Sequence, residues 1–398
     1  MEHSAPIGER IAYWRKRHEK TQAELAGLVG RSVPWLSAVE RGKHPMDSIS
    51  VLLRLANVLK VGIWELQPKL GLPPNGGDPH DPPNGLLAIS QAVMTTQAPD
   101  REAPSAADLR AQVERAKQLR QAGQHLPLKI VLPELLIAGR AAVAQQAPDA
   151  WWCLGGAYQV ASSFARAFGD TELAWISADR AVTAARESGD ELLVAVSRRL
   201  LGCAFMRRGK AWLGEAGAVC SDAADAIAPT DRTPPEGWVV WGSVHLSEGV
   251  AAARAGDRAG AGAAMRDARA AAERVGSDRN DYWEAFGPAN VGAIEVAIAL
   301  ESEDAFEALR IADRVEVEEL PSAERRARFC IDVARAYSLQ SNDQAMVLMV
   351  KEATRHAPQV VRYSAGVREL VLVGVNREKK RSRTPGLRKL AEQLNVAD

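Results

Sequence analysis

The chain has 398 residues, with 50 basic and 50 acidic side chains, so its formal net charge at pH 7 is zero. Hydrophobic residues make up 46% of it and charged residues 25%, which excludes wholesale disorder and collagen-like structure. The length indicates more than one domain, and the zero charge taken alone argues against nucleic-acid binding, because such proteins usually carry a basic excess. Alanine is abundant and aromatic residues are only 5%, a composition that favours an all-helical fold.

Residues 7–67 form the first patterned block, in which the spacing of apolar residues predicts five helices. Ile7, Ile11 and Trp14 share one face of the first helix. Thr21 and Glu24 have the spacing of a capping box, so a second helix is expected to begin there.

The third predicted helix follows closely on the second. Gly30 ends the second helix, Ser32 caps the third, and Gly42 ends the third. Leu36 and Val39 are its expected buried face. A fourth helix is expected to open at Asp47 or Ser48 and run through Leu59, before a short fifth turn with Ile63, Trp64 and Leu66. Two short helices joined by a tight turn, inside such a block, are typical of a helix-turn-helix DNA-binding domain.

The charge distribution agrees with this interpretation. Residues 1–70 hold 11 Lys/Arg and 7 Asp/Glu, a net charge of +4, and the remainder therefore carries −4. Such an asymmetry between two parts of one chain indicates an attached nucleic-acid-binding module.

One stretch of this block matches a known family. Thr21-Gln22-Ala23-Glu24-Leu25-Ala26, followed by Ser32-x-x-Trp35-Leu36-Ser37-x-Val39-Glu40-Arg41-Gly42-Lys43, resembles the Cro/C1 (XRE) repressor family. The resemblance implies a five-helix DNA-binding domain in which Gln22 holds a phosphate. It also implies a structural ion pair between Arg15 and Glu40.

The DNA-contacting residues are expected on two helices. Thr21 and Gln22 stand at the start of the second helix, whose free N–H groups suit a phosphate. The start and exposed side of the third helix, expected to enter the major groove, carry Ser32, Val33, Pro34, Trp35, Ser37 and Ala38. Arg31, Arg41 and Lys43 flank that helix as phosphate neutralisers.

The groove-facing positions lack Arg, Asn and Gln, which make the common bidentate base contacts. Sequence preference is therefore expected to depend on thymine-methyl contacts, on flanking arginines and on DNA shape. Trp35 has two interpretations, as a wedge against the DNA backbone or as a residue packed inside the domain.

Residues 71–104 contain seven prolines and read as a linker between residues 1–70 and a long repeat region at 105–398. Within the linker, the apolar run Leu86 to Met94 has the pattern of a helix docked on a neighbour.

The region 105–398 predicts about 14 helices in stacked hairpins. Gly155, Gly202 and Gly249 recur at 47-residue intervals, and each precedes a helix end and an alanine-rich second helix. This pattern resembles the tetratricopeptide repeat (TPR) family, which implies an α-solenoid. An unrelated array of helical hairpins is the alternative.

The solenoid is expected to form a homodimer and to sense a signalling peptide or a small molecule. The ligand-binding candidates on its predicted first helices are Arg198, Trp238, Trp241, His245, Tyr282 and Asn290. The competing interpretation is that the aromatic residues fill the core between hairpins and that the basic residues of this region are solvated: Arg198, Arg199, Arg207 and Arg208. Peptide receptors of this kind use ladders of asparagine, and here Asn290, Asn342 and Asn376 are few and widely spread.

Other classes of protein are disfavoured. The four cysteines lie far apart, which indicates buried thiols rather than a metal site or disulfides, and the seven histidines show no metal-binding spacing. No nucleotide-binding glycine motif follows a strand, so neither an enzyme nor a cofactor is expected. The prediction is a cytoplasmic, membrane-independent transcription regulator that binds double-stranded DNA; the alternative is an adaptor that scaffolds another protein.

Overall fold

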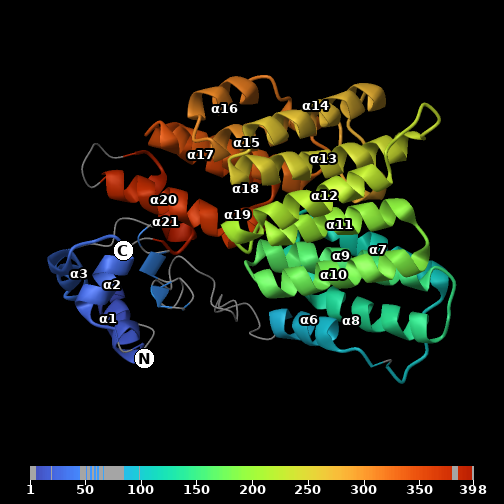
Figure 1. The fold of residues 1–398 in the computed structure, drawn as a ribbon, viewed down its shortest axis with the longest axis horizontal. Helices are drawn as coiled ribbons and strands as arrows, with labels where there is room; N and C mark the ends of the chain where they lie inside the picture. The colour runs from blue at the N-terminus through green and yellow to red at the C-terminus, as the bar shows by residue number, and fades with distance from the viewer. Residues whose placement is uncertain are drawn as a thin grey trace. The chain divides into compact units, whose positions relative to one another are not determined.

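The computed structural model describes residues 6–18, 20–44, 51, 54–55, 58–59, 61, 66, 85–97, 99–378 and 384–396. Within these ranges the chain is helical, apart from one isolated antiparallel bridge between Arg279 and Phe286, which confirms the predicted all-α fold (Figure 1). The chain divides into two compact units: unit 1 comprises Met1–Pro82 and Ser364–Asp398, and unit 2 comprises Pro83–Tyr363.

Unit 1 begins with α1 (Ile7–Arg17), α2 (Gln22–Leu28) and α3 (Val33–Glu40). Their apolar faces meet in one core, where Ile11, Leu25, Leu36 and Val39 are buried as the pattern predicted. Much of the predicted fourth and fifth helices lies outside the described residues. Among their described apolar residues, Val51, Leu55, Leu59 and Leu66 are buried in the same core, and Val58 is partly buried against it.

The C-terminal helices α20 (Ala365–Glu378) and α21 (Leu387–Gln393) belong to unit 1. This differs from the expected domain boundary, which carried the repeat region to residue 398. The physical reason is apolar packing, because Leu372 of α20 lies against the core of α1–α3. Glu378 holds the two helices together, since its carboxylate accepts from the Thr384 backbone N–H at 2.7 Å and from Arg388 at 2.8 Å.

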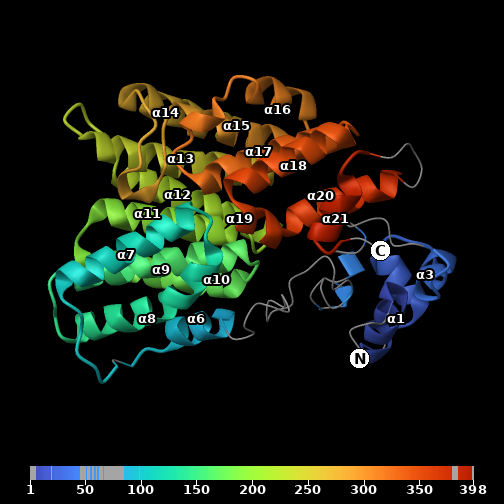
Figure 2. The ribbon, with the colours of Figure 1, turned by 180° about the vertical axis from the view of Figure 1, so that it is seen from behind.

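Unit 2 is an array of helical hairpins (Figure 2). Its α-helices are α6 (Gly85–Met94), α7 (Ala106–Gln121), α8 (His125–Ala144), α9 (Ala150–Ala167), α10 (Thr171–Ser188), α11 (Glu191–Phe205), α12 (Leu213–Ala226), α13 (Pro235–Ala255), α14 (Arg258–Val275), α15 (Pro288–Glu301), α16 (Ala305–Ala312), α17 (Ala323–Leu339), α18 (Asp343–His356) and α19 (Pro358–Tyr363). No helix among the described residues combines the length and the apolar character needed to cross a membrane. All four cysteines are buried and free, as the sequence predicted.

The first helices of the hairpins pack side by side, from α7 through α9, α11, α13 and α15 to α17, and α17 also contacts α7. Polar contacts accompany this closure. Arg120 of α7 lies 3.6 Å from the Glu324 carboxylate of α17, and the Leu126 backbone N–H donates to the Gln359 side chain at 2.9 Å. The array of unit 2 is therefore closed on itself.

The repeated glycines lie at contacts between the two helices of a hairpin. A Cβ atom on Gly155 of α9 would meet α10, one on Gly202 of α11 would meet α12, and one on Gly249 of α13 would meet α14. At Gly202 the distances would be only 2.6 Å to Cys220 Sγ and 3.0 Å to the Ala216 carbonyl oxygen. The glycine repeat thus marks hairpin contacts.

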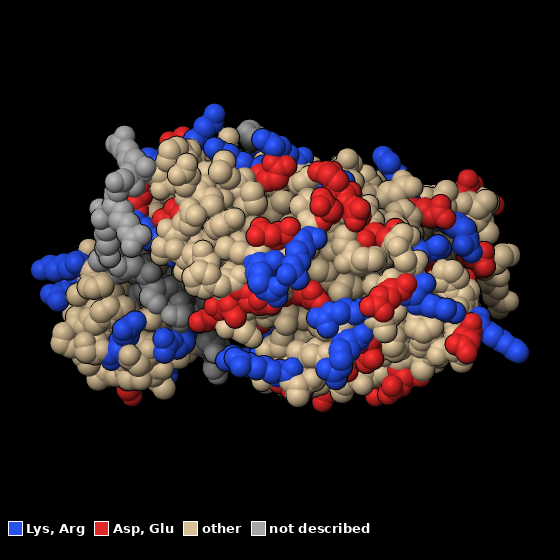
Figure 3. Space-filling view, turned by 90° about the horizontal axis from the view of Figure 1, so that it is seen from above, with Lys and Arg blue, Asp and Glu red and all other residues tan. Residues whose placement is uncertain are grey.

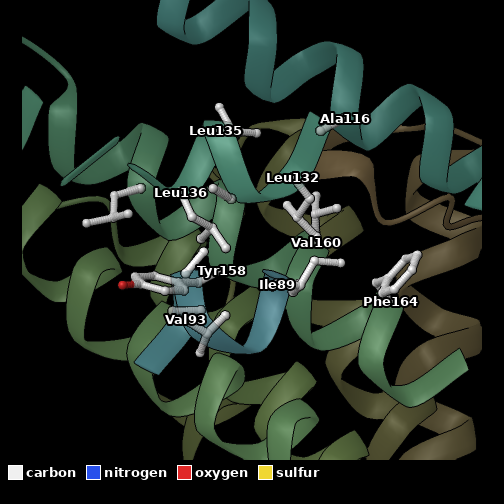
Figure 4. Close-up of a cluster of buried hydrophobic side chains, with 14 of the residues drawn as sticks. Ile89, Val93, Ala116, Leu132, Leu135, Leu136, Tyr158, Val160 and Phe164 are labelled. Carbon is white, nitrogen blue, oxygen red and sulfur yellow. The ribbon is translucent and has the colours of Figure 1, made fainter. Parts of the chain in front are cut away.

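Helix α6 lies in the second half of the region expected to be a linker, and it is the helix predicted there. Ile89 and Val93 are buried against α8 and α9, beside Leu132 and Leu136 (Figure 4). Arg140 and Arg180 donate to the backbone carbonyls of Ala92 and Val93, which have no partner within the helix. Residues 71–84 of the expected linker lie outside the described ranges.

We expect Gly202→Ala to destabilise unit 2 by about 1–3 kcal/mol, because the added methyl group overlaps Cys220 and the backbone of α12. The control is Gly217→Ala on α12, where a Cβ atom meets nothing within 4 Å. That change should stabilise the helix by about 0.5–1 kcal/mol. Chemical denaturation of both variants checks this, and equal effects would contradict the close-approach argument.

Candidate functional site

Side-chain caps fix the starts of α2 and α3. Thr21 Oγ1 accepts from the Glu24 backbone N–H at 3.2 Å, and the Glu24 carboxylate accepts from the Thr21 backbone N–H at 2.7 Å. The Thr21 backbone N–H and hydroxyl both donate to the Glu24 carboxylate, and these two hydrogen bonds lower the pKa of Glu24. Ser32 Oγ accepts from the Trp35 backbone N–H at 3.3 Å, so α3 also begins with a cap.

The turn between α2 and α3 is a helix C-cap closed by glycine. Gly30 has a φ of +69°, a left-handed conformation that glycine adopts without strain. Its N–H donates to the Gly27 carbonyl at 3.1 Å, and the Arg31 N–H donates to the Ala26 carbonyl at 2.9 Å. This pair of bonds is a Schellman motif, which sets the direction in which α3 leaves α2.

A buried ionic network links α1, α2 and α3. Arg15 Nε and Nη2 donate to the two Glu40 carboxylate oxygens at 2.6 Å and 2.9 Å, and Gln22 Nε2 donates to Glu40 at 2.7 Å. The hydrogen bond that Arg15 donates to the Glu40 carboxylate raises the pKa of Arg15. Gly8 brings α1 close to the end of α3, because a Cβ atom there would lie 2.1 Å from the Val39 carbonyl oxygen.

The network includes Gln22, the residue expected to hold a phosphate. One amide hydrogen of Gln22 is engaged by Glu40, and a primary amide has a second N–H donor. Gln22 is half-buried and is therefore oriented by α3 at the start of α2, while the adjacent Thr21 is exposed.

Apart from Thr21 and Gln22 of α2, the expected DNA-contacting residues lie on one continuous segment, residues 31–43, with graded exposure. The exposed members are Arg31, Ser32, Val33, Pro34, Arg41 and Lys43, and the half-buried members are Trp35, Ser37 and Ala38. The segment has a single carboxylate, Glu40, which is buried and paired with Arg15. Its solvent-facing charge is consequently positive.

Trp35 is packed in the domain rather than free at its surface. It lies against the buried core of unit 1, and the Arg31 guanidinium stands 5.5 Å from the centre of its ring. Trp35 therefore positions Arg31 beside the start of α3. The Arg41 side chain instead turns back onto α3, where its Nε donates to the Ser37 carbonyl at 3.1 Å.

Residues 6–66 match the helix-turn-helix domain family. The match covers the block in which α1, α2 and α3 share one core, so the N-terminal block carries a helix-turn-helix domain. No curated protein and no solved structure matches the chain.

The ligand-binding candidates of unit 2 do not gather at one place. Trp238, Trp241 and His245 follow one another along α13, with ring centres 5.8 Å and 4.3 Å apart in edge-to-face pairs. His245 Nδ1 lies 2.8 Å from the Glu248 carboxylate. Both tryptophans pack on buried clusters between hairpins, which favours the core-filling interpretation for them.

Tyr282 and Asn290 instead line a cavity of about 210 Å³. The Tyr282 hydroxyl donates to Asp190 at 3.0 Å, and Asn290 is buried on α15. Arg198 is not among the lining residues, whereas its neighbour Arg199 is, paired with Glu284 at 2.5 Å. The expectation that these arginines are solvated therefore fails for Arg199.

We expect Arg15→Met to destabilise the helix-turn-helix domain by about 2–4 kcal/mol, because Glu40 is left buried without its cation. The double variant Arg15→Met/Glu40→Leu should recover most of that loss. A thermal-unfolding double-mutant cycle measures the difference. Additive losses in the double variant would show that the pair is not coupled.

Proposed function

We propose that the chain is a sequence-specific DNA-binding transcription regulator of the Cro/C1 (XRE) type. The observation that carries the proposal is the geometry of α2 and α3: two capped helices, a Schellman turn at Gly30 and a buried Arg15–Glu40 pair behind them. The match of residues 6–66 to a helix-turn-helix domain supports it.

In this proposal α3 enters the major groove. Val33, Pro34 and Ala38 contact thymine methyl groups, and Ser37 hydrogen-bonds a base edge. Gln22, with the exposed Thr21 beside it, binds a phosphate at the start of α2. Arg31, Arg41 and Lys43 are exposed at the two ends of α3 and neutralise further phosphates.

The regulator is proposed to act as a homodimer. One helix-turn-helix reads only a half-site, and related proteins dimerise to read two half-sites about one helical turn apart. A net charge of +4 on residues 1–70 supports weak, salt-sensitive binding by one copy.

Unit 2 is proposed to be a TPR-type array that dimerises the protein and senses a peptide or small-molecule signal. The small residues at its hairpin contacts support the repeat type. The adaptor function is the alternative, and it differs in one observable: an adaptor forms a stable complex with another protein and has no affinity for DNA.

We expect Gln22→Ala and Arg31→Ala to weaken binding to all duplexes alike, because phosphate contacts carry no sequence information. Loss of Arg31 should also reduce the slope of log affinity against log salt by about 1. Val33→Ala and Ser37→Ala should instead change the preference between duplexes. Fluorescence anisotropy with an operator found by genome-wide mapping, and with its scrambled sequence, measures both effects.

Arg232→Ala, which removes an exposed arginine of unit 2, is the control for charge loss. Thermal unfolding of each variant shows whether the domain stays folded, since Gln22→Ala also removes the bond to Glu40. Uniform losses for all four domain variants would contradict the division into phosphate and base contacts. Absence of any salt-dependent DNA binding would favour the adaptor.

We expect sedimentation-velocity ultracentrifugation to show the full chain as a dimer at micromolar concentration. Addition of an operator with two half-sites should then give a complex of two chains per duplex. A chain that remains monomeric both free and on DNA would contradict the dimeric regulator.

A further inference from the structure

The cavity of unit 2 lies where its first helices converge, so residues far apart in sequence meet there. Helices α7, α9, α11, α13, α15 and α17 all contribute to its lining. Eight of the lining residues are cationic: Lys117, Arg120, Arg166, Arg199, Arg207, Arg254, Arg325 and Arg328. Arg207 and Arg254 are 47 residues apart, the interval that also separates Gly202 from Gly249.

The carboxylates of the cavity do not balance this charge. Only two line it: Glu284, which pairs with Arg199 at 2.5 Å, and Glu324, which lies 2.5 Å from Arg328 and 3.6 Å from Arg120. On the face of the array that Figure 3 shows, acidic and basic side chains are instead interspersed.

Four of the cations have no carboxylate partner within ion-pair distance among the described residues: Lys117, Arg166, Arg207 and Arg325. Of these, Arg325 donates to the Glu284 backbone carbonyl at 3.5 Å. The Lys117 ammonium is the most confined, since the residue is only 2% exposed and its described contact is the Trp152 ring at 5.2 Å. Burial, with Arg120 nearby, lowers the pKa of Lys117 to about 8. Arg207 is exposed, so the cavity opens to solvent on its side.

Asn290 is a second unsatisfied group in the same cavity. It is 1% exposed, and neither its amide nitrogen nor its amide oxygen has a hydrogen-bond partner among the described residues. Leaving buried polar atoms unpaired is costly, so such atoms usually have an explanation in function.

The loop between α14 and α15 adds strain beside these groups. Tyr282, Trp283 and Ala285 have φ values of +51°, +64° and +51°, which non-glycine residues rarely adopt. Tyr282, Trp283 and Glu284 of this loop line the cavity, and clustered backbone strain of this kind is characteristic of ligand sites.

The size of the cavity restricts the ligand. Its volume of about 210 Å³ is somewhat larger than the roughly 150 Å³ of an engineered cavity that binds benzene. This size suits a small molecule.

We propose that this cavity binds a small, multiply charged oxyanion, a phosphorylated or polycarboxylate metabolite, held by Lys117, Arg166 and Arg207. Guanidinium groups match phosphate and carboxylate oxygens in bidentate geometry, and the Asn290 amide supplies a neutral donor beside them. The inference rests on the proposed sensing role of unit 2 and names the class of signal.

The test is thermal unfolding and calorimetry of the full chain with pyrophosphate, with citrate, and with sodium chloride at the same ionic strength. Pyrophosphate or citrate should raise the unfolding temperature beyond sodium chloride, because a ligand that binds only the folded state stabilises it. A larger effect of pyrophosphate identifies a phosphorylated signal, and a larger effect of citrate a polycarboxylate. No shift beyond sodium chloride with either anion overturns the proposal.

Two cavity variants with matched controls localise the effect. Lys117→Met and Arg166→Gln should each weaken anion binding about tenfold or more, the loss expected for a charge-assisted hydrogen bond. Lys351→Met and Arg232→Gln, at exposed positions outside the cavity lining, should leave it unchanged. Lys117→Met should also raise the unfolding temperature without anion, since it removes a buried ammonium that has no carboxylate partner among the described residues.

An anion effect that persists in both cavity variants overturns the proposal. Arg166 is only half-buried, so Arg166→Gln remains informative if Lys117→Met fails to fold. DNA affinity is measured separately on the same preparations. Anion binding without DNA binding contradicts the regulator and leaves the cavity assignment intact, whereas DNA binding without anion binding contradicts only the cavity assignment.

Discussion

Close approach between helices at glycine is the constraint on which both units depend. In unit 1 a Cβ atom on Gly8 would stand 2.1 Å from the Val39 carbonyl oxygen, so only glycine lets α1 reach the end of α3. That approach lies beside the Arg15–Glu40 pair, whose strength depends on distance and on exclusion of water. In unit 2, Gly202 plays the same part against α12. In both units, the geometry of the polar contacts therefore depends on short distances between the helices.

In unit 2 this packing has an electrostatic consequence. Alanines and glycines fill the hairpin contacts, whereas long cationic side chains occupy the faces of the first helices that converge when α17 meets α7. Burial favours the neutral form of Lys117. For other ionisable groups of the cavity, oppositely charged partners counteract the effect of burial and favour the charged form. Burial alone would raise the pKa of Glu324; Arg328 and Arg120 outweigh it and hold that pKa below its usual range. The carboxylates are thus committed to particular arginines, and the uncompensated charge remains on other side chains.

Much of the architecture was predictable from local signals. The capping pattern at Thr21 and Ser32, the glycine turns and the apolar stripe of α1 act within a few residues of one another, so the sequence alone indicates the helix-turn-helix. The 47-residue glycine interval likewise indicates the hairpins. The sequence did not show that Leu372 packs on the N-terminal core, or that Lys117 and Arg166 meet Arg207 in one cavity. These are long-range juxtapositions that follow from closure of the array, which has no periodic signature.

The net charge of zero illustrates the same limit. A net charge summed over the chain does not show where the charged side chains lie, and in this protein the local electrostatics depend on where they lie. The residues 31–43 carry exposed cations and one carboxylate that is internally paired, so the field there is set by Arg31, Arg41 and Lys43. The cavity lined by Lys117 and Arg166 collects eight cations against two carboxylates, while acidic and basic side chains are interspersed on the face of unit 2 that Figure 3 shows. Low-dielectric walls strengthen the interaction of confined cations with an anion relative to the same charges in water. A neutral chain is therefore compatible with two separate anion-binding surfaces, each defined by which carboxylates are already engaged.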